Sequence, residues 1–174
     1  KNLWSLKASE ISKLYLSNEI SLDEIINSVE ERFNQVNPKI NAIPESTFEY
    51  ARKQAKLLDE NKKNDKSLGC LAGVPVTVKI NTDQTGFAST NGLRLNKSLI
   101  AHKNSTVVDN LEKAGALIVG RTNTPAFSIR WFTNNSLHGH TFNPHNKNIT
   151  PGGSSGGAAS ATASGIGCIG HGTD

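Results

Sequence analysis

Two β-branched segments separated by one helical segment constrain the fold of this chain most strongly. Residues 74–80 (Val-Pro-Val-Thr-Val-Lys-Ile) have the composition of a strand that starts after Gly73, and residues 116–119 have that of a buried strand closed by Gly120. Between them, residues 106–114 carry apolar side chains at helical spacing. Strand, helix and strand in this order form the unit of sheets with parallel strands. We therefore predict an α/β fold with a mixed β-sheet flanked by helices.

The segment before this unit is mainly helical. Residues 8–16 and 46–58 carry apolar side chains at helical spacing. The sequence Ser21-Leu-Asp-Glu24 is a capping box, which predicts the start of a further helix that Pro38 ends. Residues 41–43 are expected to form a short strand. These helices are predicted to pack as a layer against the sheet.

The most unusual segment is Pro151-Gly-Gly-Ser-Ser-Gly-Gly157, followed by a small-residue helix at 155–164, a buried strand at 166–169 and the sequence Gly170-His-Gly-Thr-Asp174. Four glycines let a backbone approach a ligand closely. No Gly-Lys-Ser/Thr follows, as a P-loop requires, and no strand precedes, as a dinucleotide site requires. A flexible linker would not lead into a helix and a buried strand.

Four blocks, in order along the chain, resemble the amidase-signature family of hydrolases. They are the glycine-serine loop with its Gly-Thr-Asp sequel, Gly73-Val-Pro-Val-Thr-Val-Lys79, Gly120-Arg-Thr-Asn-Thr-Pro-Ala-Phe127 and Gly139-His-Thr-Phe-Asn-Pro144. The resemblance covers residues 73–174 strongly and the N-terminal helices loosely. It implies a serine hydrolase that cleaves amide bonds.

Carried over position by position, the resemblance assigns four residues to the site. Lys79 would be the general base, and Ser154 the bridging serine, which family members hold after a cis peptide bond. Ser155 would support the hydrogen-bond network between lysine and serine, and Asp174 would shape the loop that carries the nucleophile and the oxyanion-hole amides. The family's nucleophilic serine lies four positions beyond Asp174, so we expect it to follow the printed sequence.

The chemistry requires a lysine that can accept a proton. An exposed lysine has a pKa of about 10.4 and is charged at pH 7, whereas burial penalises the ammonium and lowers the pKa. Lys79 lies in a predicted strand among apolar residues, with Asp83 as its nearest acid in sequence. Ser154 would relay the nucleophile's proton to Lys79 and return it to the leaving amine, through an acyl-enzyme. The resemblance implies no metal and no organic cofactor.

The predicted organisation is the N-terminal part of one amidase-signature domain, residues 1–174, cut short at its C-terminus. Residues 1–65 would form the helical layer and residues 70–174 the α/β core. Since the nucleophile is expected further on, the 174-residue chain alone is expected to be inactive. A homodimer is compatible with the sequence.

Two alternatives to a general amidase remain open. The A subunit of glutamyl-tRNA amidotransferase belongs to the same family and releases ammonia from glutamine. Its corresponding block usually carries an acidic residue and small residues, unlike Pro125-Ala-Phe-Ser-Ile-Arg-Trp-Phe132, which favours a general amidase. The other alternative is a non-catalytic binding module, in which the serine loop only holds a ligand.

Charge and composition exclude several classes of partner. The net charge is +4, with both signs interspersed, and the cluster of Lys62, Lys63 and Lys66 falls in residues 60–66, which have the composition of a solvated linker. We therefore expect no nucleic-acid partner. The family resemblance implies a small-molecule amide as the substrate. No apolar run approaches the roughly 18 residues of a membrane span. The polar start is unlike a secretory signal, so we expect a cytoplasmic protein without membrane contact.

Cysteines, histidines and two aromatic residues are further candidates for a site. Cys70 and Cys168 lack a Cys-x-x-Cys spacing and are expected to be structural thiols in a reducing compartment. Trp131 and Phe132 are compatible with both a substrate pocket and core packing. No carboxylate or cysteine set accompanies the histidines, so no metal site is predicted at His138, His140, His145 or His171.

Overall fold

The computed structural model describes residues 2–173. Its helices, with three short 3-10 turns labelled η, are η1 Leu3–Ser5, α1 Ala8–Leu16, α2 Leu22–Ile40, α3 Phe48–Lys63, η2 Arg94–Asn96, α4 Thr106–Lys113, η3 Ala126–Ser128 and α5 Gly156–Ala163. Its strands are β1 Glu45–Ser46, β2 Pro75–Lys79, β3 Leu117–Thr122, β4 Asn134–Asn135, β5 Gly139–His140 and β6 Ile169–Gly170.

The main sheet is mixed, as predicted, with the strand order β1-β3-β2-β6. Strands β3 and β6 both run parallel to β2, and β1 pairs with β3 in the antiparallel sense. Lys79 at the end of β2 is in register with Thr122 at the end of β3. Because these parallel strands end together, the segments that follow them start from the same edge of the sheet. Strands β4 and β5 form a separate antiparallel pair.

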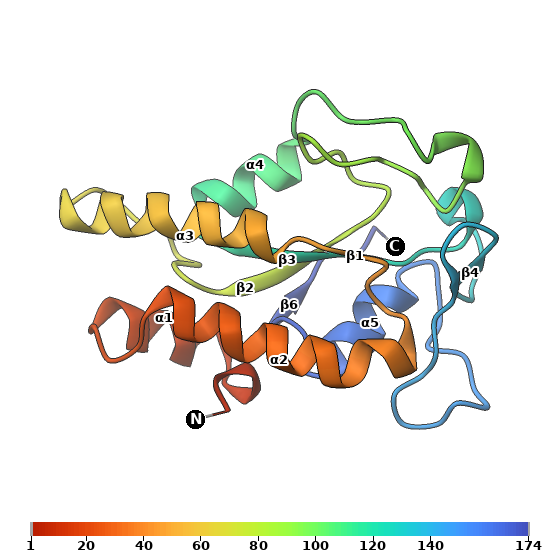
Figure 1. The fold of residues 1–174 in the computed structure, drawn as a ribbon, viewed down its shortest axis with the longest axis horizontal. Coiled ribbons are helices and arrows are strands. Elements are labelled where there is room, and N and C mark those ends of the chain that lie inside the picture. Colours follow the sequence, from red (N-terminus) through yellow and green to blue (C-terminus); the bar gives the residue numbers. More distant parts are fainter. Residues whose placement is uncertain (1, 174) are drawn as a thin grey trace.

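Helices cover both faces of the main sheet (Figure 1). On one face, Val108 of α4 packs with Val76 and Val78 of β2 and Ile118 of β3. On the other face, buried side chains of α1, α2 and α3 form one cluster with Leu117, Val119 and the α5 region. Figure 1 shows α4 above the sheet and α1, α2 and α5 below it. The sheet is therefore a buried layer between helices.

The capping box at the start of α2 is confirmed. Ser21 is the N-cap, its side chain accepts a hydrogen bond from the Glu24 N–H, and the Glu24 carboxylate accepts from the Ser21 N–H. The predicted end of this helix at Pro38 is wrong, because α2 continues to Ile40. Proline lacks one N–H donor, but Asn41 still donates its N–H to Asn37 and then ends the helix in the left-handed conformation (φ 49°).

The strand predicted at residues 41–43 is also wrong, since β1 lies further on, at Glu45–Ser46. The reason is the side chain of Asn37, whose Oδ1 accepts hydrogen bonds from the N–H groups of Ala42 and Ile43. These N–H groups are therefore engaged outside the sheet.

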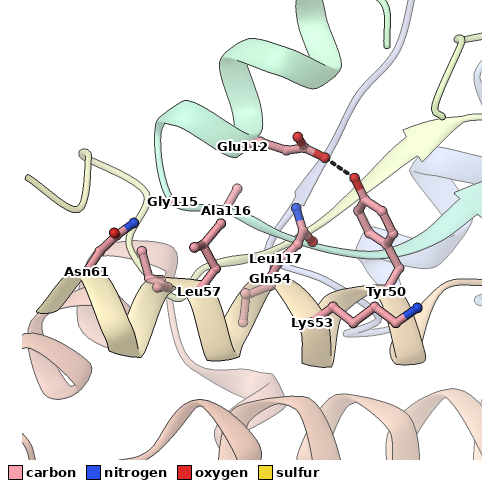
Figure 2. A pocket seen from close by; sticks show the side chains of 10 residues that line it. Tyr50, Lys53, Gln54, Leu57, Asn61, Glu112, Gly115, Ala116 and Leu117 are labelled. Atoms are coloured by element: carbon pink, nitrogen blue, oxygen red, sulfur yellow. Dashed lines mark hydrogen bonds between the residues drawn. The ribbon is translucent and has the colours of Figure 1, made fainter. Parts of the chain in front are cut away.

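Helix α3 starts at Phe48 and runs to Lys63, beyond the predicted end at residue 58. The predicted linker at 60–66 is therefore helical in its first half. The outer face of α3 is linked to α4 by a hydrogen bond that Tyr50 donates to Glu112 (Figure 2). The side chain of Gln54 accepts a hydrogen bond from the Ile118 N–H at 2.9 Å and so ties α3 to β3.

Two strand boundaries differ from the prediction. Strand β3 does not close at Gly120 but continues to Thr122. Gly120 lies inside the strand because it pairs with Ser46 of β1 and Thr77 of β2. Ile43 occupies the space beside it, so that a Cβ on Gly120 would lie 2.7 Å from Ile43 Cγ2. The strand predicted at residues 166–169 is reduced to Ile169–Gly170, where it pairs with β2.

The two cysteines are free and differ in exposure. Cys70 lies in the turn before β2 and is exposed, so its thiol has no place in the core, contrary to the structural role expected for it. Cys168 is partly buried, and burial raises the pKa of its thiol to about 11. Within residues 2–173, we find no helix with the length and hydropathy needed to cross a bilayer.

The close contact at Gly120 leads to a stability prediction. Replacing Gly120 with alanine should lower the free energy of unfolding by about 1–3 kcal/mol, because the new Cβ overlaps Ile43. Urea unfolding measures this loss. In an Ile43→Ala background the same substitution should cost less, and an equal cost in both backgrounds would show that the overlap is not the cause.

Candidate active site

Lys79 is a fully buried lysine at the C-terminal end of β2 (0% exposed). Its amine nitrogen Nζ lies 2.6 Å from Ser154 Oγ, 3.1 Å from Ser155 Oγ and 2.7 Å from Thr173 Oγ1. The neighbouring side chains along the strand, Val78 and Ile80, are buried as well. The structure thus brings Lys79 together with both serines predicted from the sequence, 75 and 76 positions further along the chain.

The glycine-serine loop reaches Lys79 because its glycines fit where a side chain would not. The peptide bond between Gly153 and Ser154 is cis. A Cβ on Gly153 would lie 2.6 Å from the Arg130 carbonyl oxygen, and a Cβ on Gly157 would lie 2.4 Å from backbone atoms of Asn123. The loop is therefore packed directly against backbone on two sides, which excludes a flexible linker as the role of this segment.

Thr173 is a site residue to which the sequence prediction gives no role. Besides its contact with Lys79, its N–H donates a hydrogen bond to Ser155 Oγ at 3.3 Å. Thr173 lies directly before Asp174 in the motif Gly170-His-Gly-Thr-Asp174. This position in the motif could have indicated Thr173 as a candidate site residue. Asp174 itself lies outside the described residues.

Asp83, the acid closest to Lys79 in sequence, is engaged elsewhere. Its carboxylate accepts a hydrogen bond from Ser89, and its backbone carbonyl accepts one from Ser105. Asp83 therefore belongs to the loop that follows β2.

Arg121 is a second buried basic residue, which the sequence prediction did not single out. Its guanidinium lies 3.0 Å from a Glu45 carboxylate oxygen and donates to the carbonyl groups of Ile80, Thr82 and Ala88 at 3.0–3.3 Å. Burial lowers its pKa, an effect that the Glu45 charge opposes. Arg121 thus fixes the chain that leaves β2 immediately after Lys79.

The histidines make structural contacts. The ring nitrogen Nε2 of His138 lies 3.0 Å from Thr90 Oγ1, and the His171 N–H donates to the Thr77 carbonyl at 2.9 Å. In the part of the chain that the structure describes, no three His, Cys, Asp or Glu side chains are placed to hold a metal ion.

Trp131 and Phe132 do not pack in the core. Trp131 is 87% exposed and Phe132 is 41% exposed, and Phe127 and Ile129 on the same segment are exposed as well. This segment lies against the glycine-serine loop, since a Cβ added to Gly153 would lie 2.6 Å from the backbone nitrogen of Phe132. An apolar surface therefore adjoins the loop that carries Ser154.

A cavity of about 270 Å³ lies at the opposite end of β3 from Lys79 and the serine loop. It is bounded by α3, Glu112 of α4 and the start of β3 at Leu117, as Figure 2 shows, whereas Lys79 neighbours the end of β3 at Thr122. The polar side chains beside Lys79 are therefore separate from this cavity.

Comparison with known proteins identifies the family. A family model described as Amidase matches residues 24–174. The chain belongs to the amidase-signature family.

Individual relatives of this amidase-signature chain carry different activities in their names. The chain is 45% identical over 172 residues to an indoleacetamide hydrolase of Bradyrhizobium diazoefficiens, and the match covers 99% of this chain and 33% of that protein. It is 40% identical over 162 residues to the A subunit of a glutamyl-tRNA(Gln) amidotransferase from Fusobacterium nucleatum, covering 93% of this chain and 33% of that protein.

Solved structures of the family share the fold. A bacterial aryl acylamidase of the amidase-signature family is 34% identical, with a TM-score of 0.88 over 93% of this chain and 34% of its own. The chain thus spans about a third of the length of the relatives it matches.

Two half-buried histidines, His138 and His171, lead to a prediction on acid stability. Burial lowers the pKa of both His138 and His171. Unfolded histidines have a pKa of about 6.5, so the unfolded state binds more protons just below that pH. The free energy of unfolding should therefore fall as the pH is lowered from about 7 to about 5.

Urea unfolding across this pH window measures the effect. A double variant, His138→Gln with His171→Gln, serves as the control and should show a flatter dependence. If the wild type and the double variant lose stability equally over this range, the two histidines are not responsible.

Proposed function

We propose that the whole protein hydrolyses a carboxamide, with Lys79 as general base and Ser154 as the serine that relays protons to it. The observation that carries the proposal is the 2.6 Å distance between the buried Lys79 amine and the Ser154 hydroxyl. Membership of the amidase-signature family supports the same reaction.

The proposed mechanism depends on an uncharged amine. A lysine ammonium has three protons and no acceptor, whereas a neutral amine has two N–H donors and one lone pair. Complete burial of Lys79 penalises the charged form. In the neutral form, the hydroxyls of Ser155 and Thr173 can accept the two protons of the amine, while the Ser154 hydroxyl donates to its lone pair. Ser154 then takes up the proton of a nucleophile as its own proton passes to Lys79.

The nucleophile is proposed to be the serine that follows Asp174 in the motif of the family. Its attack on the amide carbon forms an ester and releases the amine, which receives the proton stored on Lys79 through Ser154. Water then cleaves the ester and releases the carboxylic acid. Ser155 and Thr173, both within 3.1 Å of the Lys79 amine, hold that amine in place.

The substrate is proposed to be a small amide with an aromatic or otherwise apolar acyl group. The indoleacetamide hydrolase is similar over nearly the whole chain, and the exposed Phe127, Ile129 and Trp131 provide apolar surface beside the serine loop. Indole-3-acetamide should therefore release ammonia in the presence of the full-length protein.

A glutaminase is the second candidate, favoured by the 40% identity with the amidotransferase relative. The same ammonia assay separates the two. Glutamine turnover that increases with a partner protein and charged tRNA, with no turnover of indole-3-acetamide, would favour the glutaminase.

Replacing Lys79 with alanine in the full-length protein should abolish turnover while the fold is retained, because the substitution removes the amine that takes up the proton from Ser154. Ammonia release and circular dichroism measure the two effects. A Lys79→Ala protein with near-normal rates would rule out Lys79 as the base.

A fluorophosphonate, which reacts with activated serines, tests the acyl-enzyme. The full-length protein should be labelled covalently, and the 174-residue chain should remain unlabelled because the proposed nucleophile lies beyond it. A folded full-length protein without any label would instead indicate a non-catalytic binding module.

A further inference from the structure

Thr124 is a fully buried residue that contacts the backbone of Ser154. Its side chain is 0% exposed, and its Oγ1 lies 3.2 Å from the Ser154 carbonyl oxygen. The backbone of Thr124 is held on both sides: its N–H donates to Asn123 Oδ1 at 3.0 Å, and its carbonyl accepts from Asn135 Nδ2 at 2.7 Å. The hydroxyl that reaches Ser154 is therefore supported by a fixed backbone.

Ser128 holds the Thr124 hydroxyl from the other side. The two hydroxyl oxygens are 2.8 Å apart. Ser128 Oγ also donates to Asn91 Oδ1 at 2.6 Å and accepts from Asn81 Nδ2 at 3.1 Å. Ser128 and Phe127 both have the left-handed backbone conformation, with φ of 57° and 61°, which is uncommon for residues other than glycine. The turn thus places the Ser128 hydroxyl among three polar side chains.

Counting protons shows what Thr124 supplies. Each hydroxyl has one proton, and that of Ser128 is shared between Asn91 Oδ1 and Thr124 Oγ1. Asn81 contributes its own N–H proton to Ser128. The Thr124 proton is directed to the Ser154 carbonyl. Without it, the buried carbonyl of Ser154 loses a donor.

These contacts close a ring around the proposed proton relay. Asn81 is two residues beyond Lys79, and the ring runs from Asn81 through Ser128 and Thr124 to Ser154, which lies 2.6 Å from the Lys79 amine. The ring connects the end of β2 to the serine loop independently of the amine itself. These contacts therefore fix the backbone of Ser154 relative to the segment that follows Lys79.

We propose that Thr124, held by Ser128, is a positioning residue that sets the distance between the Lys79 amine and the Ser154 hydroxyl. This inference rests on the proposed function, in which Ser154 relays a proton to Lys79. Thr124 itself touches the carbonyl of Ser154 and not its hydroxyl, so it acts on the reaction through Ser154.

The test is the rate constant for fluorophosphonate labelling of the full-length protein, together with crystal structures of the same variants. Thr124→Val should lower the rate constant about tenfold, the equivalent of one hydrogen bond, and lengthen the distance between Lys79 Nζ and Ser154 Oγ. Thr124→Ser, which keeps the hydroxyl, should restore both values. Ser128→Ala, at a half-buried position, should cause a smaller decrease in the same direction.

Thr47→Val is the matched control. It also removes a buried threonine hydroxyl that donates to a backbone carbonyl, that of Ile118 at 2.7 Å, but away from Lys79. It should lower the thermal stability and leave the labelling rate unchanged at a temperature where the protein is folded. Wild-type rates and an unchanged distance in both Thr124→Val and Ser128→Ala would overturn the inference.

The same experiments separate a failure of the proposed function from a failure of the inference about Thr124. A wild-type protein that is not labelled would overturn the hydrolase mechanism, and the crystallographic distance in Thr124→Val would still decide whether Thr124 positions Ser154.

Discussion

The arrangement of this chain depends on one buried contact, that between the amine of Lys79 and the hydroxyl of Ser154. A lysine that is completely removed from water is costly unless its hydrogen-bonding groups are satisfied. Here three hydroxyls surround the amine, two of them from the glycine-serine loop and one from Thr173. The loop can approach so closely because glycines flank the serines and pack against backbone.

The fold provides this contact through the common edge of parallel strands. Strands β2 and β3 end at Lys79 and Thr122, which are paired in register, so the residues beyond each strand meet at one place. Arg121 secures the loop after β2 by binding three of its carbonyl groups, and Thr124 contacts Ser154 after β3. Helices on both faces bury the sheet behind this edge. Packing, backbone hydrogen bonds and site geometry are therefore parts of one arrangement.

The sequence predicts those features that depend on local patterns. The capping box at Ser21, the helix that begins at Thr106 and the strand that carries Lys79 all follow from residue type and spacing, and all are confirmed. The family resemblance is confirmed as well, and the structure brings Lys79, Ser154 and Ser155 together, while their catalytic roles stay predictions.

Features that depend on contacts between distant segments could not be predicted in this way. The side chain of Asn37 takes the N–H groups that a strand at 41–43 would need, and Ile43 fills the space beside Gly120 in the middle of β3. Thr124 and Thr173 lie within the family motifs, but the motifs do not show that their side chains meet Ser154 and Lys79. Such residues become recognisable only when the topology is known.

The protonation state of Lys79 in the resting full-length protein tests the central claim most directly. Nitrogen NMR of ¹⁵N-lysine-labelled protein distinguishes a neutral amine from an ammonium, and Lys79→Met identifies the signal by its loss. We expect a neutral amine signal at pH 7 that disappears in Lys79→Met. An ammonium signal for Lys79 at pH 7 that persists at higher pH would contradict it.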